Sequence, residues 1–402
     1  MLKNKNVIVG VSGGIAAYKA ADLVSRLKKQ HANVDVIMTE NAAKFISPLT
    51  FQTLAINPVY VDMFAEPKHF DVEHISLAKK ADVFIIAPAT ANIIGKIANG
   101  IADDLLTTTI MATTSKVIFA PAMNTNMYLN PIVQKNMSYL KELGYEFIEP
   151  GTGLLACQDY GPGRMAEPAD IVEHIIQSFV KKDLEGKKIV VTAGPTIEPL
   201  DPVRYVTNHS SGKMGYSIAK VAKDRGAEVV LITGPTHLEP PKGVRVVRVN
   251  TTLDMFDAVE KEFDSCQVLI KAAAPLDFRP DKVSDVKIKK DDGENDQLNI
   301  RYIKNPDIAE YFGRIKEDRI VVGFAAETDN LIDYAKKKLK KKNLDFIVAN
   351  NILKEGAGFK GDTNIVTIID KDENIIDYPV MDKDKVAQLI LDKVKYILDT
   401  KS

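Results

Sequence analysis

Cysteine, tryptophan and net charge are what this sequence has least of. It contains two cysteines, Cys157 and Cys266, no tryptophan, and 53 basic against 54 acidic residues, for a formal charge of −1. Two cysteines in different halves exclude a disulfide framework and are typical of the reducing cytoplasm, where we expect the protein. The charge balance gives no reason to expect nucleic acid or an anionic membrane as a partner.

Long apolar runs are scarce as well. None approaches the roughly 20 residues that span a bilayer. The N-terminal MLKNKNVIVG turns into a strand pattern without the apolar stretch of a signal peptide. The 402 residues, 45% hydrophobic and 27% charged, are instead typical of soluble globular domains. At about 100–200 residues per domain, this length indicates two or three domains.

One pattern that is present occurs twice: a short apolar strand, a glycine turn and a helix. Asn6–Val11 leads into SGGI and a helical pattern over residues 16–29. Residues 188–192 lead into AGPT, with a helical pattern further on, over 217–225. Such units build parallel sheets with helices on both faces, and ligands bind beyond the carboxyl ends of the strands. Two starts therefore predict two nucleotide-type sites.

The remaining sequence continues this alternation. In the first half we expect strands at Asn33–Met38, 83–87 and 117–120, and helices at 92–99, 104–113 and 169–182. In the second half we expect strands at 229–233, 244–249, Val268–Lys271, 320–324 and 346–349, helices at 253–263, 307–314 and 331–342, and a late hairpin before a final helix. The charged segment 181–187 is interpreted as a linker between domains 1–182 and 183–402, and the polar segment 281–297 as a loop.

The glycine loops match neither common nucleotide motif. SSGKMG at 210–215 lacks the spacing of a P-loop and has Met214 where Ser or Thr is required. Neither strand start completes G-x-G-x-x-G, and the second strand is followed by Thr39 instead of an acidic residue. A mononucleotide phosphate at Ser12, Gly13, Gly14 and Ile15 is the better hypothesis. The alternative is a tight turn with no ligand.

Several strings in the first half are weak singly and specific together: SGGIAAYK, His74, PATANIIGK, NGIADDLL, PAMN, the LAC that ends at Cys157, and GRMAEP. With the second half, they resemble the bifunctional coenzyme A biosynthesis family, a phosphopantothenoylcysteine decarboxylase fused to a phosphopantothenate–cysteine ligase. The resemblance implies a flavodoxin-like FMN domain. It implies cofactor contacts at Ser12, Gly13, Gly14, Ile15, Thr39, Pro88, Ala89, Thr90 and Asn92.

The resemblance also assigns catalytic roles. An N-acylated cysteine carboxylate has no electron sink, so the family uses FMN to oxidise the thiol to a thioaldehyde before CO2 leaves. His74 would act in this stage, Asn124 would hold the carboxylate through its amide NH2, and Cys157 would protonate the resulting enethiolate. Substrate would be covered by the segment Arg164, Met165, Ala166 and Glu167.

In the second half the resemblance rests on AGPTIEPLDPVRYVTNHSSGKMG, AAAPLDFRP, KIKK, KNPDI, GFAAET and a lysine-rich helix that ends in DFIVANN. It implies a Rossmann-like domain that activates 4′-phosphopantothenate with CTP as an acyl-cytidylate, which the amine of cysteine attacks. Mg2+ would bridge the phosphates, and its ligands are not identified. Asn208 and Lys287 would be catalytic, and the binding residues would be Asp277, Lys287, Lys289, Lys304, Asn305, Pro306, Asp307, Phe324, Lys338 and Lys342.

Two departures and two alternatives accompany this prediction. Tyr128 stands where the family often has tryptophan, and Gln158 stands where glycine is common; we expect both to change packing rather than mechanism. The alternatives are a regulatory FMN protein that binds a partner, and a decarboxylase with a degenerate ligase half. Retention of His74, Asn124 and Cys157 disfavours the first. The resemblance further implies a homo-oligomer built on trimers, up to a dodecamer, with the decarboxylase site between subunits.

Overall fold

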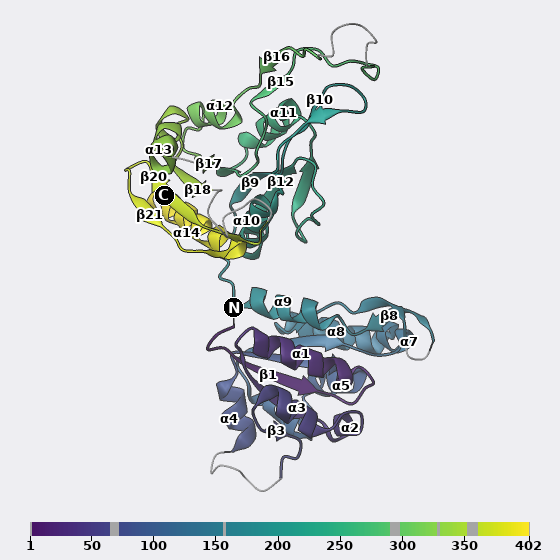
Figure 1. Ribbon diagram of the computed structural model, residues 1–402. Coiled ribbons are helices and arrows are strands. Elements are labelled where there is room, and N and C mark those ends of the chain that lie inside the picture. Colours follow the sequence, from purple (N-terminus) through teal and green to yellow (C-terminus); the bar gives the residue numbers. More distant parts are fainter. Residues whose placement is uncertain are drawn as a thin grey trace. The chain divides into compact units, whose positions relative to one another are not determined.

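The computed structural model describes residues 2–64, 72–155, 158–289, 298–327, 330–351 and 361–401. The chain forms two compact units, Met1–Phe179 and Val180–Ser402. Each is built around a sheet that is mainly parallel, with helices on both faces (Figure 1). The α/β fold class expected for both halves is therefore confirmed. Within the described residues, no helix is long and apolar enough to cross a membrane.

The sheet of the first unit has the strand order β3-β2-β1-β4-β5-β6. Without the two-residue edge strand β3, this is the 2-1-3-4-5 order of flavodoxin-like folds. Its strands are β1 (Asn6–Val11), β2 (Asn33–Met38), β3 (Val59–Tyr60), β4 (Val83–Ala89), β5 (Lys116–Pro121) and β6 (Glu146–Phe147). Its helices are α1 (Ala17–Lys29), α2 (Glu40–Ala43), α3 (Pro48–Ala55), α4 (Glu73–Lys80), α5 (Ala91–Ala98), α6 (Leu105–Ala112), α7 (Thr125–Leu129), α8 (Pro131–Glu142) and α9 (Pro168–Ser178). A hairpin of β7 (Gly151–Leu154) and β8 (Tyr160–Arg164) precedes α9.

Alternation along the strands of the first sheet builds two cores. Val7, Val9 and Val11 of β1 face the core that includes α1, α3 and α9. Ile8 faces the core that includes α4, α5, α6 and α8. Because both faces are covered, these strands are apolar throughout, which is why the sequence showed them as continuous apolar runs.

The sheet of the second unit has the order β13-β12-β9-β14-β17-β18-β20-β21. Its first six strands follow the Rossmann order 3-2-1-4-5-6, and the last two join antiparallel. The strands are β9 (Lys188–Ala193), β12 (Glu228–Thr233), β13 (Arg245–Arg248), β14 (Val268–Lys271), β17 (Ile320–Glu327), β18 (Phe346–Asn351), β20 (Val366–Asp370) and β21 (Ile375–Asp377). The helices are α10 (Lys213–Asp224), α11 (Thr252–Phe263), α12 (Ile308–Arg314), α13 (Leu331–Lys341) and α14 (Lys383–Lys401).

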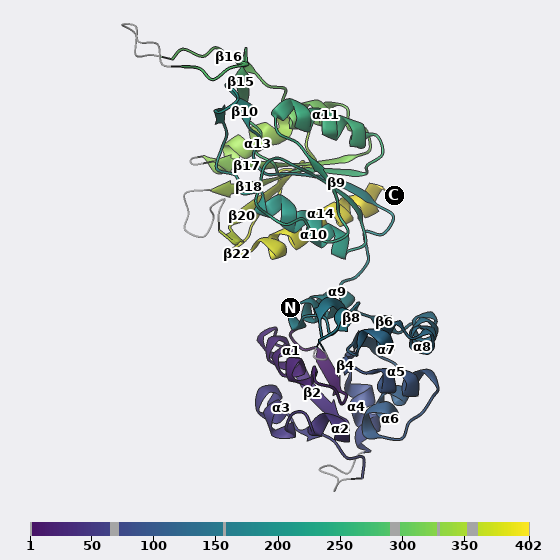
Figure 2. The same ribbon diagram turned by 90° about the vertical axis from the view of Figure 1, so that its right-hand side faces the viewer.

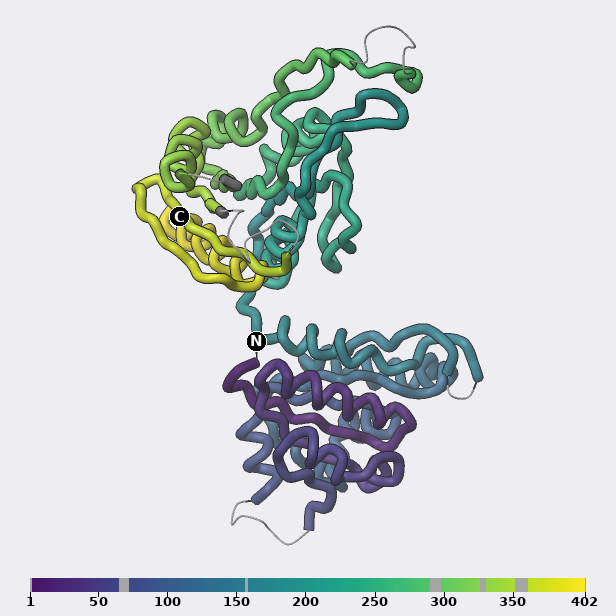
Figure 3. The backbone as a smooth tube through the Cα atoms, in the orientation of Figure 1, coloured from purple at the N-terminus to yellow at the C-terminus, as the bar shows by residue number. Residues whose placement is uncertain are grey.

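Helices cover both faces of this second sheet as well. Figure 2 shows α11 and α13 on one face and α10 and α14 on the other, in agreement with the two cores that they form. The unit also contains short two-stranded ribbons, and the tube in Figure 3 shows one of them projecting from it. The ribbons are β10 (Glu198–Pro199) with β11 (Tyr205–Val206), β15 (Phe278–Pro280) with β16 (Tyr302–Lys304), and β19 (Thr363–Asn364) with β22 (Met381–Asp382).

Several elements differ from expectation. α10 begins at Lys213, four residues earlier than predicted, because Gly212 adopts a left-handed conformation (φ 79°) that turns the chain into the helix. α8 was not expected, although Asn130 at its N-cap and Pro131 at its first position are standard start signals. The two-stranded ribbons were not expected either, because their strands are too short to show a period of two.

The expected linker at 181–187 is partly packed onto the second unit. Leu184 is fully buried in its core. The Asp183 carboxylate accepts hydrogen bonds of 2.8 and 2.9 Å from the Arg225 guanidinium, whose third contact is Asp392 at 2.6 Å. The hydrogen bonds from Arg225 lower the pKa of the Asp183 carboxyl below its usual range. Charged residues in this segment therefore fasten the start of the second unit.

We expect Asp183→Asn to destabilise the second unit by about 1–3 kcal/mol, because it leaves the buried Arg225 guanidinium with a weaker partner. Hydrogen exchange of peptides from α10 in the full chain measures this change. Asp392→Asn is the matched control: Asp392 contacts the same guanidinium but its side chain is 64% exposed, so its loss should cost less than about 1 kcal/mol. Equal effects from the two variants would contradict the assignment.

The pH dependence has a defined sign. Because the pKa of Asp183 is lower in the folded state, the carboxylate contributes its full share to the free energy of unfolding above its unfolded-state pKa. This contribution is lost as pH falls through the folded-state pKa. The difference between wild type and Asp183→Asn should therefore persist at pH 5 and disappear only below the ordinary aspartate range.

Candidate active sites

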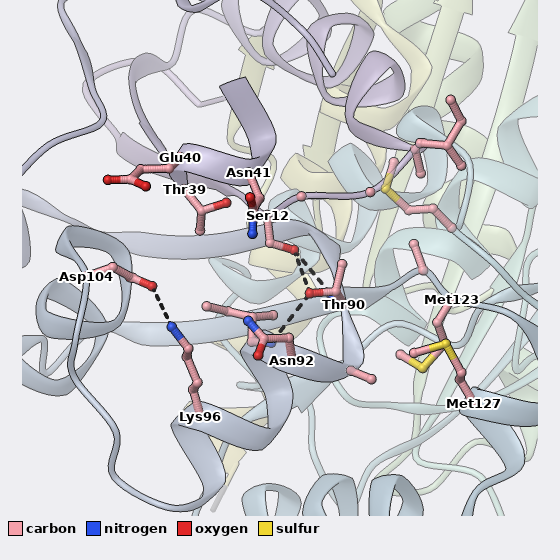
Figure 4. Close-up of a pocket in the computed structure, with 18 of the residues that line it drawn as sticks. Ser12, Thr39, Glu40, Asn41, Thr90, Asn92, Lys96, Asp104, Met123 and Met127 are labelled. Carbon is pink, nitrogen blue, oxygen red and sulfur yellow. Dashed lines mark hydrogen bonds and ion pairs between the residues drawn. The ribbon is translucent and has the colours of Figure 1, made fainter. Parts of the chain in front are cut away.

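The pocket of the first unit opens where the strand order reverses. β1 and β4 are neighbours, but the chain leaves them toward opposite edges of the sheet, so the loops after them diverge and leave a crevice. Ser12 follows β1, and its hydroxyl donates to the Pro88 carbonyl oxygen at 2.8 Å and accepts from the Thr90 N–H at 3.2 Å. Figure 4 shows Ser12 and Thr90 joined across the crevice. These bonds fix the two loops to each other.

The crevice belongs to a cavity of about 1220 Å³, which is large enough for a mononucleotide with a fused ring system. The expected site residues that line it are Ser12, Gly13, Gly14, Ile15, Thr39, Thr90, Asn92, Asn124, Arg164 and Met165. Those described but not among the lining residues are Pro88, Ala89, His74, Ala166 and Glu167. Cys157 lies outside the described residues, although the neighbouring Leu154 and Leu155 line the cavity.

Backbone geometry in this pocket favours an anion. A Cβ on Gly13 would lie 2.5 Å from the Asn41 Cβ, so the loop needs glycine to approach α2. The positive ends of α1, α2 and α5 meet at the cavity, since their N-cap residues Ala16, Thr39 and Thr90 all line it. No side chain caps α1. The N–H groups of Ala17 and Lys19 donate to the Gly14 and Ala16 carbonyl oxygens, so a phosphate would be bound by other N–H groups of the loop and first turn.

Several residues that carry charge or sulfur line the cavity although the sequence did not single them out. Lys96 of α5 contacts the carboxylates of Asp103 at 2.6 Å and Asp104 at 3.1 Å, and all three line the cavity. Figure 4 shows Lys96 and Asp104 on one side, and Met123 and Met127 on the other. The sequence does indicate such an ion pair, because the two adjacent carboxylates of NGIADD closely follow the helix that carries Lys96.

Asn124 lies at the carboxyl end of β5 as the N-cap of α7. Its Oδ1 accepts from the Asn126 N–H at 2.8 Å, which orients the amide. Its Nδ2 donates to the Asp159 carboxylate at 2.8 Å. The NH2 group therefore already binds a carboxylate, which is the chemical group that the resemblance expects it to hold.

The segment from Arg164 to Glu167 is anchored to α1. Lys19, a buried lysine, donates to Glu167 Oε1 at 2.9 Å and contacts the Met165 carbonyl oxygen at 3.4 Å. Arg164 lies 3.2 Å from the same Glu167 oxygen. The Lys19 hydrogen bond lowers the pKa of the Glu167 carboxyl, so it stays ionised at neutral pH. Glu167 thus ties the segment down rather than facing the cavity.

The two departures from the family pattern have structural settings. Gln158 has φ 66°, a left-handed conformation that favours glycine, so its side chain costs the turn some stability. Tyr128 packs in the core beside α8, and its hydroxyl donates to Glu149 at 3.0 Å. Burial and this bond raise the pKa of Tyr128 to about 12. Neither is among the residues that line the cavity.

The second unit has the same reversal of strand order, between β9 and β14. A Cβ on Gly215 would lie 2.5 Å from the Ala193 Cβ, so the first turn of α10 packs directly against the end of β9. Asn208 lies in the segment before α10. It donates to the Ala274 carbonyl oxygen and accepts from the Ser210 N–H at 2.9 Å. Its amide is therefore held between the loops that follow β9 and β14.

The segment that carries Lys287 and Lys289 is held by its backbone. The Ile288 N–H donates to the buried carboxylate of Asp201 at 3.1 Å, and its carbonyl oxygen accepts from Arg204 at 2.7 Å. Both lysine side chains are exposed. A fixed backbone with exposed side chains suits residues that contact a ligand.

Some of the expected binding residues of this unit contact one another, and others lie apart. Lys342 contacts Asp307 at 2.7 Å. Although burial alone would raise the pKa of the Asp307 carboxyl, the Lys342 hydrogen bond and charge lower it. Phe324 instead packs against the core on the α10 and α14 face, and Lys304 is exposed on β16.

Asn305 is placed as an internal support. Its Nδ2 donates to the buried Glu198 carboxylate at 3.1 Å and to the Leu276 carbonyl oxygen at 2.9 Å, and its Oδ1 accepts from Arg279 at 2.9 Å. The Glu198 carboxylate also accepts from the Thr252 N–H at 3.0 Å. The side chain of Asn305 is thus committed to the protein and positions the adjoining Pro306 and Asp307.

Metal-ligand geometry adds no further candidate. In the described ranges, no group of three or more His, Cys, Asp and Glu side chains could hold a metal ion. Mg2+ in nucleotide enzymes usually binds through one or two carboxylates together with substrate phosphates and water. A protein-only cage is therefore not expected for it.

Comparisons with known proteins cover nearly the whole chain. Residues 1–180 match the Flavoprotein family model, and residues 184–397 match the model of the DNA/pantothenate metabolism flavoprotein C-terminal domain. The coenzyme A biosynthesis bifunctional protein CoaBC of Bacillus subtilis is 50% identical over 98% of this chain and 97% of its own length. The Escherichia coli protein of the same name is 43% identical over 100% and 99%, respectively.

A solved structure, the C-terminal domain of a coenzyme A biosynthesis bifunctional protein CoaBC, is 42% identical, with a TM-score of 0.47 over 55% of this chain and 100% of that chain. The full-length relatives leave neither half unmatched, which disfavours both alternatives raised from the sequence. The chain therefore belongs to the family of bifunctional coenzyme A biosynthesis enzymes, with a flavoprotein unit followed by a pantothenate-metabolism unit.

Proposed function

We propose that residues 1–182 form an FMN-dependent phosphopantothenoylcysteine decarboxylase and that residues 183–402 form a CTP-dependent phosphopantothenate–cysteine ligase. The observation that carries this division is a strand-order reversal, the place where open α/β sheets bind ligands, in each of two separate sheets. The ligase would make the amide that the decarboxylase consumes. A single chain would then perform two consecutive steps of coenzyme A biosynthesis.

The cavity of the first unit suits FMN. Its phosphate would bind at Ser12, Gly13, Gly14 and Ile15, where the close approach of Gly13 to Asn41 and the ends of three helices favour an anion. When bound, FMN would take two electrons from the substrate thiol to give a thioaldehyde and would return them after CO2 loss, so that the overall reaction to the aminothiol is redox-neutral. The carboxylate then lies β to a C=S group, so that CO2 can leave with its electrons delocalised as an enethiolate.

The protein would position the reacting groups. The Asn124 NH2 would donate to the substrate carboxylate in place of Asp159, because two carboxylates beside one amide would repel each other. Cys157 would then donate a proton to the enethiolate carbon. The segment held by Lys19 and Glu167 would cover the substrate and exclude water.

We infer that a second subunit completes this site. His74 is not among the residues that line the cavity of its own chain. Ile15 and Tyr18 line the cavity and are yet 61% and 62% exposed, as expected for side chains that another subunit covers. This arrangement agrees with the trimer-based homo-oligomer that the resemblance implies.

In the second unit, CTP would activate 4′-phosphopantothenate as an acyl-cytidylate because a free carboxylate is a poor electrophile. Lys338 and Lys342 would offset phosphate charge, with Mg2+ bridging the phosphates. Lys287 would stabilise the activated carbonyl, and Asn208 would hold the acyl-cytidylate until the cysteine amine attacks. The fixed backbone at Ile288 would keep Lys287 in reach.

We expect the purified protein to be yellow and to release FMN, not FAD, on denaturation. Gly13→Ala should weaken FMN binding about 10–100-fold, since a side chain forced against Asn41 costs about 1–3 kcal/mol. Gly95→Ala is the control, because its Cβ would meet nothing closer than 3.8 Å. Flavin titration of the apoprotein gives the affinities; unchanged binding in Gly13→Ala, or stoichiometric FAD in wild type, would refute the site.

Cys157→Ser should release CO2 but accumulate an oxidised enethiol, with formation of the aminothiol product reduced about 10²–10⁴-fold. His74→Asn should stop before CO2 release. Mass spectrometry of single-turnover reactions distinguishes the two blocks. Cys266→Ala is the control, because Cys266 is buried in the core of the second unit.

The same variants test the shared site. Co-expressed His74→Asn and Cys157→Ser chains should regain part of the decarboxylase activity, because some sites would receive an intact residue from each subunit. Absence of recovery in isolated mixed oligomers would contradict the proposal that His74 acts across the interface.

Lys287→Gln should reduce CTP-dependent ligation about 10²–10³-fold through loss of charge at the activated carbonyl, and leave decarboxylation of supplied phosphopantothenoylcysteine unchanged. Asn208→Asp should impair ligation similarly, because its carboxylate would repel the acyl phosphate. Lys282→Gln, on the same exposed segment, is the charge-matched control. Separate assays of the two half-reactions decide it; a decarboxylase loss in Lys287→Gln with FMN still bound would show that the units are not independent.

A further inference from the structure

Lys271 occupies the centre of the ligand-facing edge of the second sheet. It is the last residue of β14 and is paired between Thr192 of β9 and Gly323 of β17. The strand order reverses between β9 and β14, which is where open α/β sheets bind ligands. No string that identified the family drew attention to this lysine.

Strand alternation places the Lys271 side chain on a particular face. Leu269, two residues earlier, belongs to the core formed with α11, α12 and α13. Residues two apart on a strand share a face, so Lys271 points toward the same helices. This face therefore leads to α13, the helix that carries the lysines.

Four charged groups from neighbouring elements act electrostatically on this ammonium. Lys338 and Lys342 come from α13, Asp307 is the N-cap of α12, and Asp277 lies in the segment after β14. Lys342 is paired with Asp307 at 2.7 Å. Lys271 has no hydrogen bond or ion pair from its side chain to any described residue.

This arrangement is unfavourable in the unliganded protein. Burial, followed by the charge of Lys342, lowers the pKa of Lys271 to about 8, although Asp307 and Asp277 act in the opposite direction. Lys271 is half-buried at the end of a strand whose other residues are buried. A half-buried cation near two others, with no ion pair to a described residue, is explained if an anion with several charges binds between them.

We propose that Lys271 is an additional phosphate contact of the nucleotide site in the second unit, acting together with Lys338 and Lys342. The inference rests on the proposed ligase function and adds a residue that the resemblance does not supply. Because the three lysines come from a strand and a helix on one face of the sheet, they can contact different oxygens of a triphosphate. A monophosphate would engage fewer of them.

The experiment compares CTP binding to full-length wild type, Lys271→Met and Lys340→Met by isothermal titration calorimetry at pH 7 with Mg2+ and without pantothenate substrate. Lys340 lies on α13 too, but it is 69% exposed and paired with Glu373, so its loss changes net charge equally without touching the site. We expect Lys271→Met to bind CTP at least about tenfold more weakly, as for a lost charge-assisted bond. CMP affinity should change less, and Lys340→Met should match wild type.

Two further readouts separate a lost contact from a damaged fold. Since the folded-state pKa of Lys271 lies below its ordinary value, the protonated group opposes folding below about pH 8, and this cost fades as pH rises toward 10.5. Unliganded Lys271→Met should therefore melt above wild type at pH 7, yet gain less from added CTP. Wild-type affinity for CTP should fall between pH 7.5 and 9, whereas that of Lys271→Met should not.

The outcomes are distinct. If wild type binds CTP and Lys271→Met binds it equally well, the role of Lys271 is overturned and the ligase proposal stands. Equal losses in Lys271→Met and Lys340→Met also overturn it, because the effect would then be one of net charge. Wild type and Lys340→Met that both bind no CTP overturn the ligase proposal, and this inference with it.

Discussion

Reversal of strand order is the constraint on which both candidate sites depend. In each sheet the first strand sends its chain toward one edge, and the fourth sends its chain toward the other, so two loops separate above the sheet. The Ser12 hydroxyl closes the base of the first crevice through Pro88 and Thr90. In the second sheet Lys271 lies at the reversal itself, paired between Thr192 and Gly323.

Close backbone packing shapes the chain at both reversals. Gly13 lets the loop after β1 lie against Asn41, and Gly215 lets the first turn of α10 lie against Ala193. In each case a methyl group would sit 2.5 Å from a neighbouring Cβ. Glycine is therefore required by space at these two positions.

The two sites would meet negative charge in different ways. The first presents helix N-termini and a polar floor, and its lining lysine Lys96 is already matched by Asp103 and Asp104. The second gathers full cations, Lys271, Lys338 and Lys342. Partial charges at helix ends suffice for one phosphate, whereas a triphosphate carries more charge than backbone dipoles offset. This contrast fits the proposed assignment of FMN to one unit and CTP to the other.

The sequence by itself determined the fold class, the two sheets and the family. Strands such as Asn6–Val11 are covered on both faces, so they appear as continuous apolar runs that any reader of the sequence can find. Ser12 to Ile15 could be assigned to a ligand loop because strand, glycine turn and helix are consecutive in the chain.

Tertiary structure decided what depends on distant segments. It turned Asn305 inward to the buried Glu198 and tied Glu167 to Lys19, although both had been expected to contact ligands. It also brought Lys271 toward α13, about seventy residues away in the chain. Periodicity shows which face a residue occupies. Only the packing of strands and helices around a common edge determines which charges meet there.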